Sequence, residues 1–206
     1  MPRQNRVAPT GELIATPTRG TLMGNRGILH DADGNIRRQY VGRRWIICVL
    51  DFKGRHRQVM SPGQYTELFF FDEAVAFAAG HRPCAECQRA RFNLFRQHWA
   101  GTDAARLRVD EIDSTLHRER LTDDRRKRTH RAPLDTLPDG AFILWTPETP
   151  ALVLGARLFP WTSEGYGAPF ARPTGIEAEV LTPPTLVAVL ANGYRPVLHA
   201  QISSET

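Results

Sequence analysis

The stretch "AAGHRPCAECQRARF", residues 78–92, decides the fold of this chain. Gly80 ends an apolar segment, and Pro83 prevents a helix from continuing through the turn. Cys84 and Cys87 then stand three positions apart at the start of a second predicted helix. This placement gives both sulfurs a common direction, and the free N–H groups of the helix start favour thiolate. The pair is therefore half of a metal site, a redox pair, or two buried small hydrophobic residues.

The surroundings favour metal over redox chemistry. A thioredoxin-type pair follows a strand in a βαβ unit, whereas here a helix and a proline precede it. A structural zinc needs four ligands, so two more must come from elsewhere. Cys48 is the only other thiol, and it lies in an apolar run predicted to join the same sheet as residues 65–71. His56, past the next turn, is the predicted fourth ligand, ahead of His81 and His98. The predicted zinc site is thus Cys84, Cys87, Cys48 and His56.

Hydrophobic patterning predicts an α+β fold with two lobes, because strands and helices are interleaved without regular βαβ repetition. Strands are expected over 44–52, 65–71, 139–145, 150–159 and 174–181, and helices over 73–79, 85–99, 108–121 and 183–191. Asp72 and Thr182 are the predicted N-caps of the first and last of these helices. We expect an Arg/Gly/Pro-rich extension with a hairpin (1–40), a small mixed or antiparallel sheet with helices (41–101), a basic helical connector (102–135) and a C-terminal α/β lobe (136–206).

The turn at the cysteine pair has an echo near the end of the chain. "AVAFAAGHRPCAEC" and "TLVAVLANGYRPVLHA" align Gly80 with Gly193, and each sequence continues with a ring, an arginine and a proline. The second copy has Val197 and Ala200 in place of the two cysteines. The Gly-x-Arg-Pro frame is therefore most simply a device that stops a helix, and the thiols are an addition to it.

Positive charge is concentrated in the first part of the chain. Residues 1–60 carry 11 basic and 4 acidic groups, whereas 132–206 carry 3 and 7. Of the 27 basic residues 25 are arginine, whose fork suits phosphate, although a solubilising surface has the same composition. Nucleic acid is the predicted partner, and the candidate contacts are Arg43, Arg44, Lys53, Arg55, Arg57, Arg82 and Arg89.

The segment "FFFDEAVAFAAGHRPCAECQ", residues 69–88, resembles the metal-binding domain of Ada-type DNA methylphosphotriester repair proteins. The resemblance covers about residues 44–91 and is specific only from Phe70 to Gln88. It implies a zinc-binding module that contacts DNA in a repair or DNA-processing setting. Cys84 and Cys87 match the last cysteine pair of that family. Its first pair, which includes the methyl acceptor, is replaced here by His56 and Met60, so self-methylation is not expected.

Two other readings stay open at this stage. One is an enzyme acting on nucleic acid or nucleotides at a site between the lobes, with Asp110, Asp113, His117 and His130 as participants. Separately, Lys127, Arg128, His130 and Arg131 are candidate phosphate contacts, although a flexible basic linker explains the same segment equally well. The other is a metal-free interaction protein that retained only the fold. No apolar run has membrane-span or signal-peptide character, so we expect a cytoplasmic protein.

Overall fold

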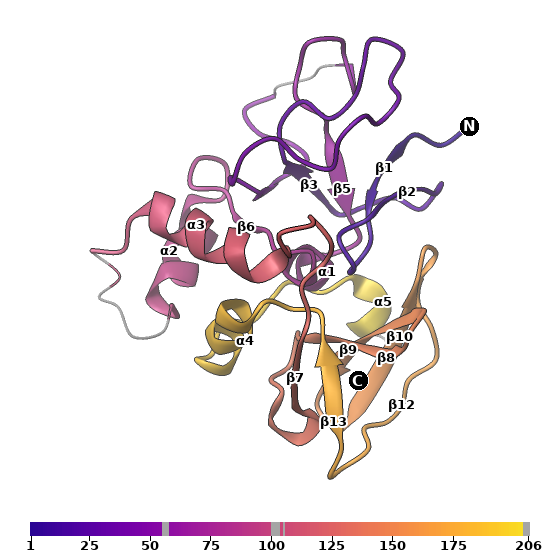
Figure 1. Cartoon of the computed structure of the whole chain (residues 1–206), viewed down its shortest axis with the longest axis vertical. Coiled ribbons are helices and arrows are strands. Elements are labelled where there is room, and N and C mark those ends of the chain that lie inside the picture. Colours follow the sequence, from indigo (N-terminus) through magenta and orange to yellow (C-terminus); the bar gives the residue numbers. More distant parts are fainter. Residues whose placement is uncertain (55–57, 100–103, 105, 204–206) are drawn as a thin grey trace.

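The computed structural model describes residues 1–54, 58–99, 104 and 106–203. It is an α+β fold with two sheets, as the sequence predicts. The first sheet stands at one end of the long axis and the second at the other, and α1, α4 and α5 lie between them (Figure 1). Among the described helices, none is both long and apolar enough to cross a membrane.

The first sheet has the strand order β2-β1-β5-β3-β4-β6. Its strands are β1 (Gln4–Val7), β2 (Leu13–Ala15), β3 (Leu22–Asn25), β4 (Ile46–Cys48), β5 (Leu68–Phe70) and β6 (Arg82–Pro83). Segments from the predicted extension and from the predicted cysteine module thus pair in one sheet, since β3 lies between β5 and β4. The predicted domain boundaries themselves stay predictions.

The second sheet is an antiparallel set from the last third of the chain. Its order is β11-β10-β9-β8-β13-β7, with β12 added beside β10. The strands are β7 (His130–Pro133), β8 (Phe142–Thr146), β9 (Thr149–Leu154), β10 (Arg157–Thr162), β11 (Gly165–Tyr166), β12 (Phe170–Ala171) and β13 (Glu177–Val180). A 3₁₀ turn, Leu134–Thr136, follows β7.

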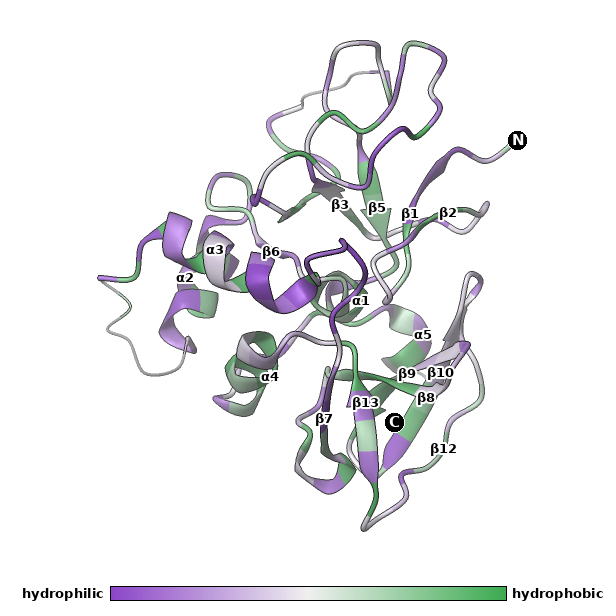
Figure 2. Cartoon of the chain, viewed as in Figure 1, coloured by the Kyte–Doolittle hydropathy of each residue, from purple (hydrophilic) through white to green (hydrophobic). Residues whose placement is uncertain are grey.

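Within the described residues, five helices cover the space between and beside the sheets. They are α1 (Glu73–Ala78), α2 (Arg89–Gln97), α3 (Val109–Arg120), α4 (Pro184–Ala191) and α5 (Ala200–Ser203). Apolar residues concentrate on α1, α4 and the strands of the second sheet, while α3 is largely hydrophilic (Figure 2). A continuous core cluster contains Phe70, Phe77, Phe95, Leu186 and Tyr194, so residues from both parts of the chain share it.

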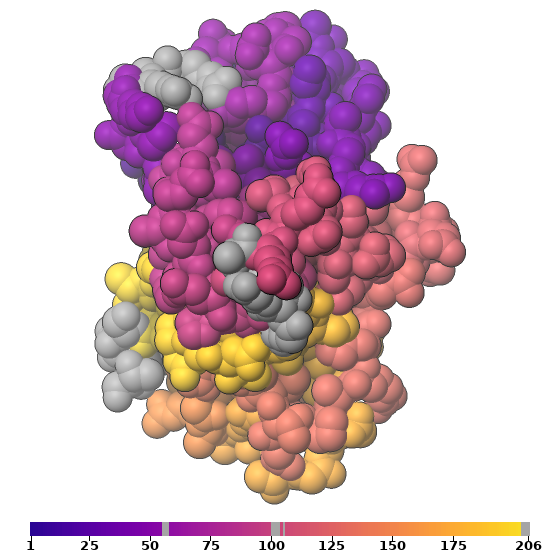
Figure 3. All heavy atoms as spheres, turned by 90° about the vertical axis from the view of Figure 1, so that its left-hand side faces the viewer, coloured from indigo at the N-terminus to yellow at the C-terminus, as the bar shows by residue number. Residues whose placement is uncertain are grey.

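Helix α1 ties the C-terminal segment to the first sheet through two buried carboxylates. Asp72 caps α1 as predicted, accepting from the Val75 N–H, and its other oxygen accepts from the Tyr166 hydroxyl at 2.8 Å. Glu73 accepts from the Tyr194 hydroxyl at 2.5 Å and the Val197 N–H at 2.8 Å. The C-terminal segment accordingly lies between the middle helices and the second sheet (Figure 3).

The predicted cap of α4 is wrong. The helix begins at Pro184 after Pro183, and the Thr182 hydroxyl accepts instead from the backbone N–H of Phe142 at 2.9 Å. Thr182 is fully buried, so its hydroxyl satisfies a strand N–H that would otherwise lack a partner.

Candidate metal centre

The three cysteines of the chain meet where β4 and β6 end. These strands pair in parallel, with Ile46 opposite Arg82 and Ile47 opposite Pro83, so the next residues, Cys48 and Cys84, lie side by side. The Cys84 N–H donates to the Ile47 carbonyl at 2.9 Å, which extends the ladder by one bond. Cys87 follows one turn later, just before α2. The site is therefore built by sheet register and by the turn that Pro83 and Gly80 impose.

The sulfur atoms are close enough to share one metal ion. All three lie within 4.8 Å of one another, and none forms a disulfide. A tetrahedral zinc with Zn–S bonds of about 2.3 Å holds its sulfurs roughly 3.8 Å apart, so small side-chain adjustments suffice. Cys48 and Cys84 are buried and Cys87 is half-buried. The three side chains thus form a cluster that can bind a metal.

Hydrogen bonds inside the cluster favour one thiolate. The Cys48 thiol and then the Cys87 thiol donate to Cys84 Sγ, and together with backbone N–H groups they lower the pKa of Cys84. One of these is the Glu86 N–H, at 3.4 Å from the sulfur. The pKa of Cys48 is raised, because its S–H is the donor to Cys84 and to Cys87 and because it is buried. Thiolate is the form that binds metal, so hydrogen bonds that favour a thiolate in this cluster also favour metal binding.

A cavity of about 380 Å³ opens beside the cysteines. Its walls are mainly apolar and include Met23, Phe52 and Phe69 as well as all three cysteines. Glu67 also lines it, with one carboxylate oxygen accepting from the Met60 N–H at 2.7 Å. His56, the predicted fourth ligand, lies outside the described residues, as do Arg55 and Arg57.

The predicted nucleic-acid contacts fall into two groups. Arg43, Arg44, Lys53 and Arg89 are exposed, the first two before β4 and the others near the cysteine cluster. Arg82 is a correction to the prediction, because it is 2% exposed and makes a bidentate pair with Asp113 through two 2.8 Å bonds. Its guanidinium holds α3 against β6 and is not presented to a phosphate outside the protein.

The four residues named as participants in an enzyme site lie in different surroundings. Asp113 faces Arg82 inside the protein, whereas Asp110 is exposed. His117 Nδ1 lies 3.1 Å from a nitrogen of Arg120 and accepts from it. His130 lies on β7, opposite Val180 of β13. The four residues proposed for an enzyme therefore point into different environments.

Sequence reasoning missed a cluster of buried cations on the other side of the His81 turn. Arg26 and Arg120 are each 1% exposed, and both guanidiniums lie against the ring of Trp45. No local motif announces this cluster, because Arg26, Trp45 and Arg120 come from three separate parts of the chain.

Comparison with known proteins identifies no relative. No family model matches the sequence, and neither the curated proteins nor the solved structures contain a significant match.

Proposed function

We propose that this protein binds one zinc ion through Cys48, Cys84 and Cys87 and that the metal is structural. The observation that carries the proposal is the convergence of three sulfurs within 4.8 Å at the ends of two paired strands. Thiolate-rich sites prefer zinc among the common divalent metals because sulfur is a soft ligand. Zinc would fasten β4 to the turn before α2, and His56 is the fourth ligand that the sequence predicts.

The zinc content of the purified protein tests this proposal. We expect about one zinc per chain in the parent and a large loss in Cys84→Ser. Val197→Ser is the matched control, because Val197 occupies the corresponding position of the second helix-stop turn and is exposed. At free zinc about a thousandfold above Kd, binding stabilises the folded state by about 4 kcal/mol, so chelation should lower Tm. A parent protein without zinc after purification and reconstitution would leave the metal-free interaction protein as the better interpretation.

We further propose that the protein binds a nucleic acid, namely DNA, in a repair or DNA-processing setting. The exposed cations Arg43, Arg44, Lys53 and Arg89 support this, as does the resemblance of residues 70–88 to Ada-type modules. Methyl transfer to a cysteine is not part of the proposal. The cysteine pair that includes the methyl acceptor in the Ada-type family is replaced here by His56 and Met60.

The salt dependence of DNA affinity tests the nucleic-acid proposal. Each phosphate contact contributes about 0.9 to the slope of log K against log salt, because binding releases condensed counterions. Replacing both Arg43 and Arg44 by Gln should weaken binding and reduce the slope by about 2. Arg157→Gln, an exposed arginine on β10 of the second sheet, should leave the slope unchanged. A flat salt response of the parent protein would contradict phosphate contact.

A further inference from the structure

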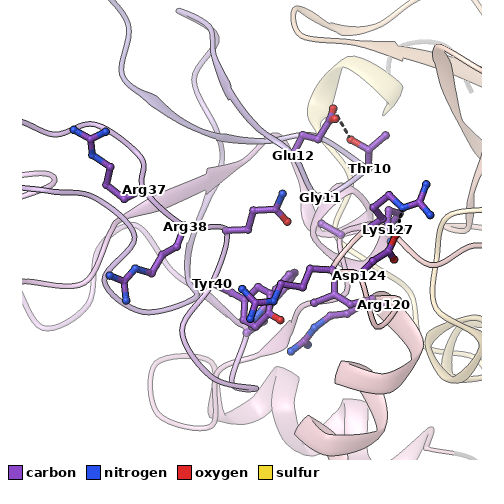
Figure 4. A pocket seen from close by; sticks show the side chains of 15 residues that line it. Thr10, Gly11, Glu12, Arg37, Arg38, Tyr40, Arg120, Asp124 and Lys127 are labelled. Carbon is purple, nitrogen blue, oxygen red and sulfur yellow. Dashed lines mark hydrogen bonds and ion pairs between the residues drawn. The ribbon is translucent and has the colours of Figure 1, made fainter.

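A large basic cavity lies between the first sheet and the segment that follows α3. Its volume is about 720 Å³. Arg37, Arg38, Arg120, Arg125, Arg126 and Lys127 line it, and its acidic lining residues are Glu12 and Asp124. Asp124 is already paired with Arg126 at 2.5 Å. Figure 4 shows Tyr40, Arg120, Asp124 and Lys127 gathered at one end, with the loop that carries Arg37 and Arg38 opposite them.

Two buried guanidiniums meet at Trp45, which lines the floor of this cavity. The guanidinium carbons of Arg26 and Arg120 lie 3.9 and 4.0 Å from the Trp45 ring, so they are no more than about 8 Å apart. In the part of the chain that the structure describes, no carboxylate forms an ion pair with either arginine. Burial is the main cause that lowers the pKa of both groups, to about 9 for Arg120.

The hydrogen bonds of these arginines go to neutral acceptors. Arg26 donates to His81 Nε2 at 3.1 Å and to the Gly11 carbonyl at 2.8 Å. Arg120 donates to the carbonyls of Gly80 at 2.9 Å and Arg43 at 2.6 Å. One terminal nitrogen of Arg26 and the Nε of Arg120 are buried with no hydrogen-bond partner among the described residues. These donors remain unused inside the protein, and Gly11, beside the first of them, lines the cavity.

Lys127 adds a third positive group to the same place. Its ammonium donates to the Ala78 carbonyl at the end of α1. Burial, and then the charges of Arg26 and Arg120, lower the pKa of Lys127 to about 7. Three neighbouring cations therefore lie together, and among the described residues no carboxylate forms an ion pair with any of them. The nearby charge of Asp113, which is already paired with Arg82, raises the pKa of Arg120 but does not outweigh burial.

Such a cluster is costly for a protein that only has to fold. A buried cation is ordinarily paired with an acid, as Arg82 is with Asp113, which lies two helical turns before Arg120 on α3. A dianionic phosphate would neutralise two of the three charges, and guanidinium groups match its oxygens in fork geometry. Tyr40 lines the same cavity and offers a ring beside the phosphate position.

We propose that this cavity binds the phosphate group of a phosphate monoester, with Arg120 and Lys127 in its lining and Arg26 stacked on the ring of Trp45, which also lines it. The monoester is either a mononucleotide or the phosphorylated end of a nucleic acid strand. This inference is independent of zinc and goes beyond the proposed contact with the phosphodiester backbone, because it assigns a single phosphate to one cavity.

Lys127→Met gives the sharpest test, because the two possible roles of the lysine predict opposite changes in stability. If Lys127 serves to bind phosphate, its charge is uncompensated in the protein without ligand. Replacing Lys127 with a neutral side chain of similar length should therefore raise Tm in the absence of ligand. A purely structural lysine would instead lower Tm when its bond to the Ala78 carbonyl is lost. Arg118 is an exposed arginine on α3 outside the cavity lining. Arg118→Met is therefore the control and should change neither Tm nor the affinity for phosphate ligands.

Isothermal titration calorimetry with inorganic phosphate, adenosine 5′-monophosphate and adenosine measures the site directly. We expect saturable binding of the monophosphate, none of adenosine, and about 10- to 100-fold weaker binding in Lys127→Met, the usual effect of losing one charge-assisted hydrogen bond. Absence of saturable binding for both phosphate ligands and for the DNA end described next would overturn the proposal. So would equal affinities in the parent and Lys127→Met.

Oligonucleotides with and without a 5′-phosphate distinguish the two sources of the monoester. Preference for the phosphorylated end, lost in Lys127→Met, supports a strand terminus. Equal affinity for both ends, together with saturable mononucleotide binding, supports a free nucleotide. The Arg43→Gln, Arg44→Gln double variant should weaken DNA binding in either case and leave mononucleotide affinity unchanged, so failure of the backbone proposal is separable from failure of this one.

Discussion

The segments 78–87 and 191–200 end their helices in the same way and then differ in structure and chemistry. After α1, the Gly80 N–H bonds to the Phe77 carbonyl and the next N–H to the Ala76 carbonyl. After α4, Gly193 and its successor repeat this pattern on Leu190 and Val189. Both glycines have left-handed φ, 82° and 108°, and both following rings, His81 and Tyr194, are fully buried. The shared frame ends a helix, as the sequence echo predicts.

The side chains after the shared frame differ in what they contact. In the first turn Arg82 is buried and Cys84 and Cys87 meet Cys48. In the second turn Arg195 and Val197 are exposed, and Ala200 begins α5. The same helix-ending turn thus leads into a candidate metal centre after α1 and, after α4, into the segment whose Tyr194 and Val197 donate hydrogen bonds to Glu73. Substitutions at matching positions of the two turns can separate the effect of ending a helix from the effect of the contacts made by the side chains that follow.

The arginine pair should show the largest difference in stability. Arg82→Met leaves Asp113 buried without its partner, which typically costs about 3–5 kcal/mol. Arg195→Met changes an exposed side chain and should stay within about 0.5 kcal/mol. Chemical denaturation of the two variants measures both free energies of unfolding. Adding Asp113→Leu to Arg82→Met should recover much of the loss, and a loss of equal size in both single variants would contradict the contrast.

The glycine pair should show a smaller difference. Alanine at either position adopts a left-handed φ, at a cost of about 1–2 kcal/mol. At Gly80 the new Cβ would also lie 2.7 Å from Arg120 Cδ, whereas at Gly193 the nearest atom is His98 Cε1 at 3.3 Å. Gly80→Ala is therefore expected to lower Tm more than Gly193→Ala, and to weaken mononucleotide binding because Arg120 must shift. A larger loss of Tm in Gly193→Ala than in Gly80→Ala would contradict this prediction, because the contact with Arg120 would then add nothing to the cost of alanine at Gly80.

Local signals predicted the longer helices and the strands around Cys48 and Phe70, but not the strands of residues 1–25 or the division of 150–159 between β9 and β10. The cap at Asp72, the stop at Gly80 and the strand runs around Cys48 and Phe70 depend on neighbouring residues, and the structure has each of them. The convergence of the three cysteines was likewise predicted, because Cys84 and Cys87 are paired at a turn and Cys48 is the only other thiol of the chain. His56 could not be compared, since it lies outside the residues described.

The features that sequence reasoning missed depend on distant partners. Arg82 looked like a surface cation because Asp113, which buries it, is 31 residues away. Asp72 and Glu73 read as an ordinary acidic helix start, although Tyr166 and Tyr194 turn them into anchors for the C-terminal segment. The ring of Trp45 brings together Arg26 and Arg120, which are far apart in the sequence. Charge counting along the chain finds such groups but cannot distinguish a solvated face from a buried cluster.

The number of sulfur ligands around bound zinc tests the central claim most directly. X-ray absorption at the zinc edge, on protein purified with one zinc per chain, counts the Zn–S bonds. The cysteine cluster predicts three sulfurs at about 2.3 Å and one lighter ligand. Two sulfurs are expected in Cys48→Ser if zinc is retained, and three in Val197→Ser. A shell of nitrogen and oxygen alone, or an unchanged sulfur count in Cys48→Ser, would contradict a metal centre built on Cys48, Cys84 and Cys87.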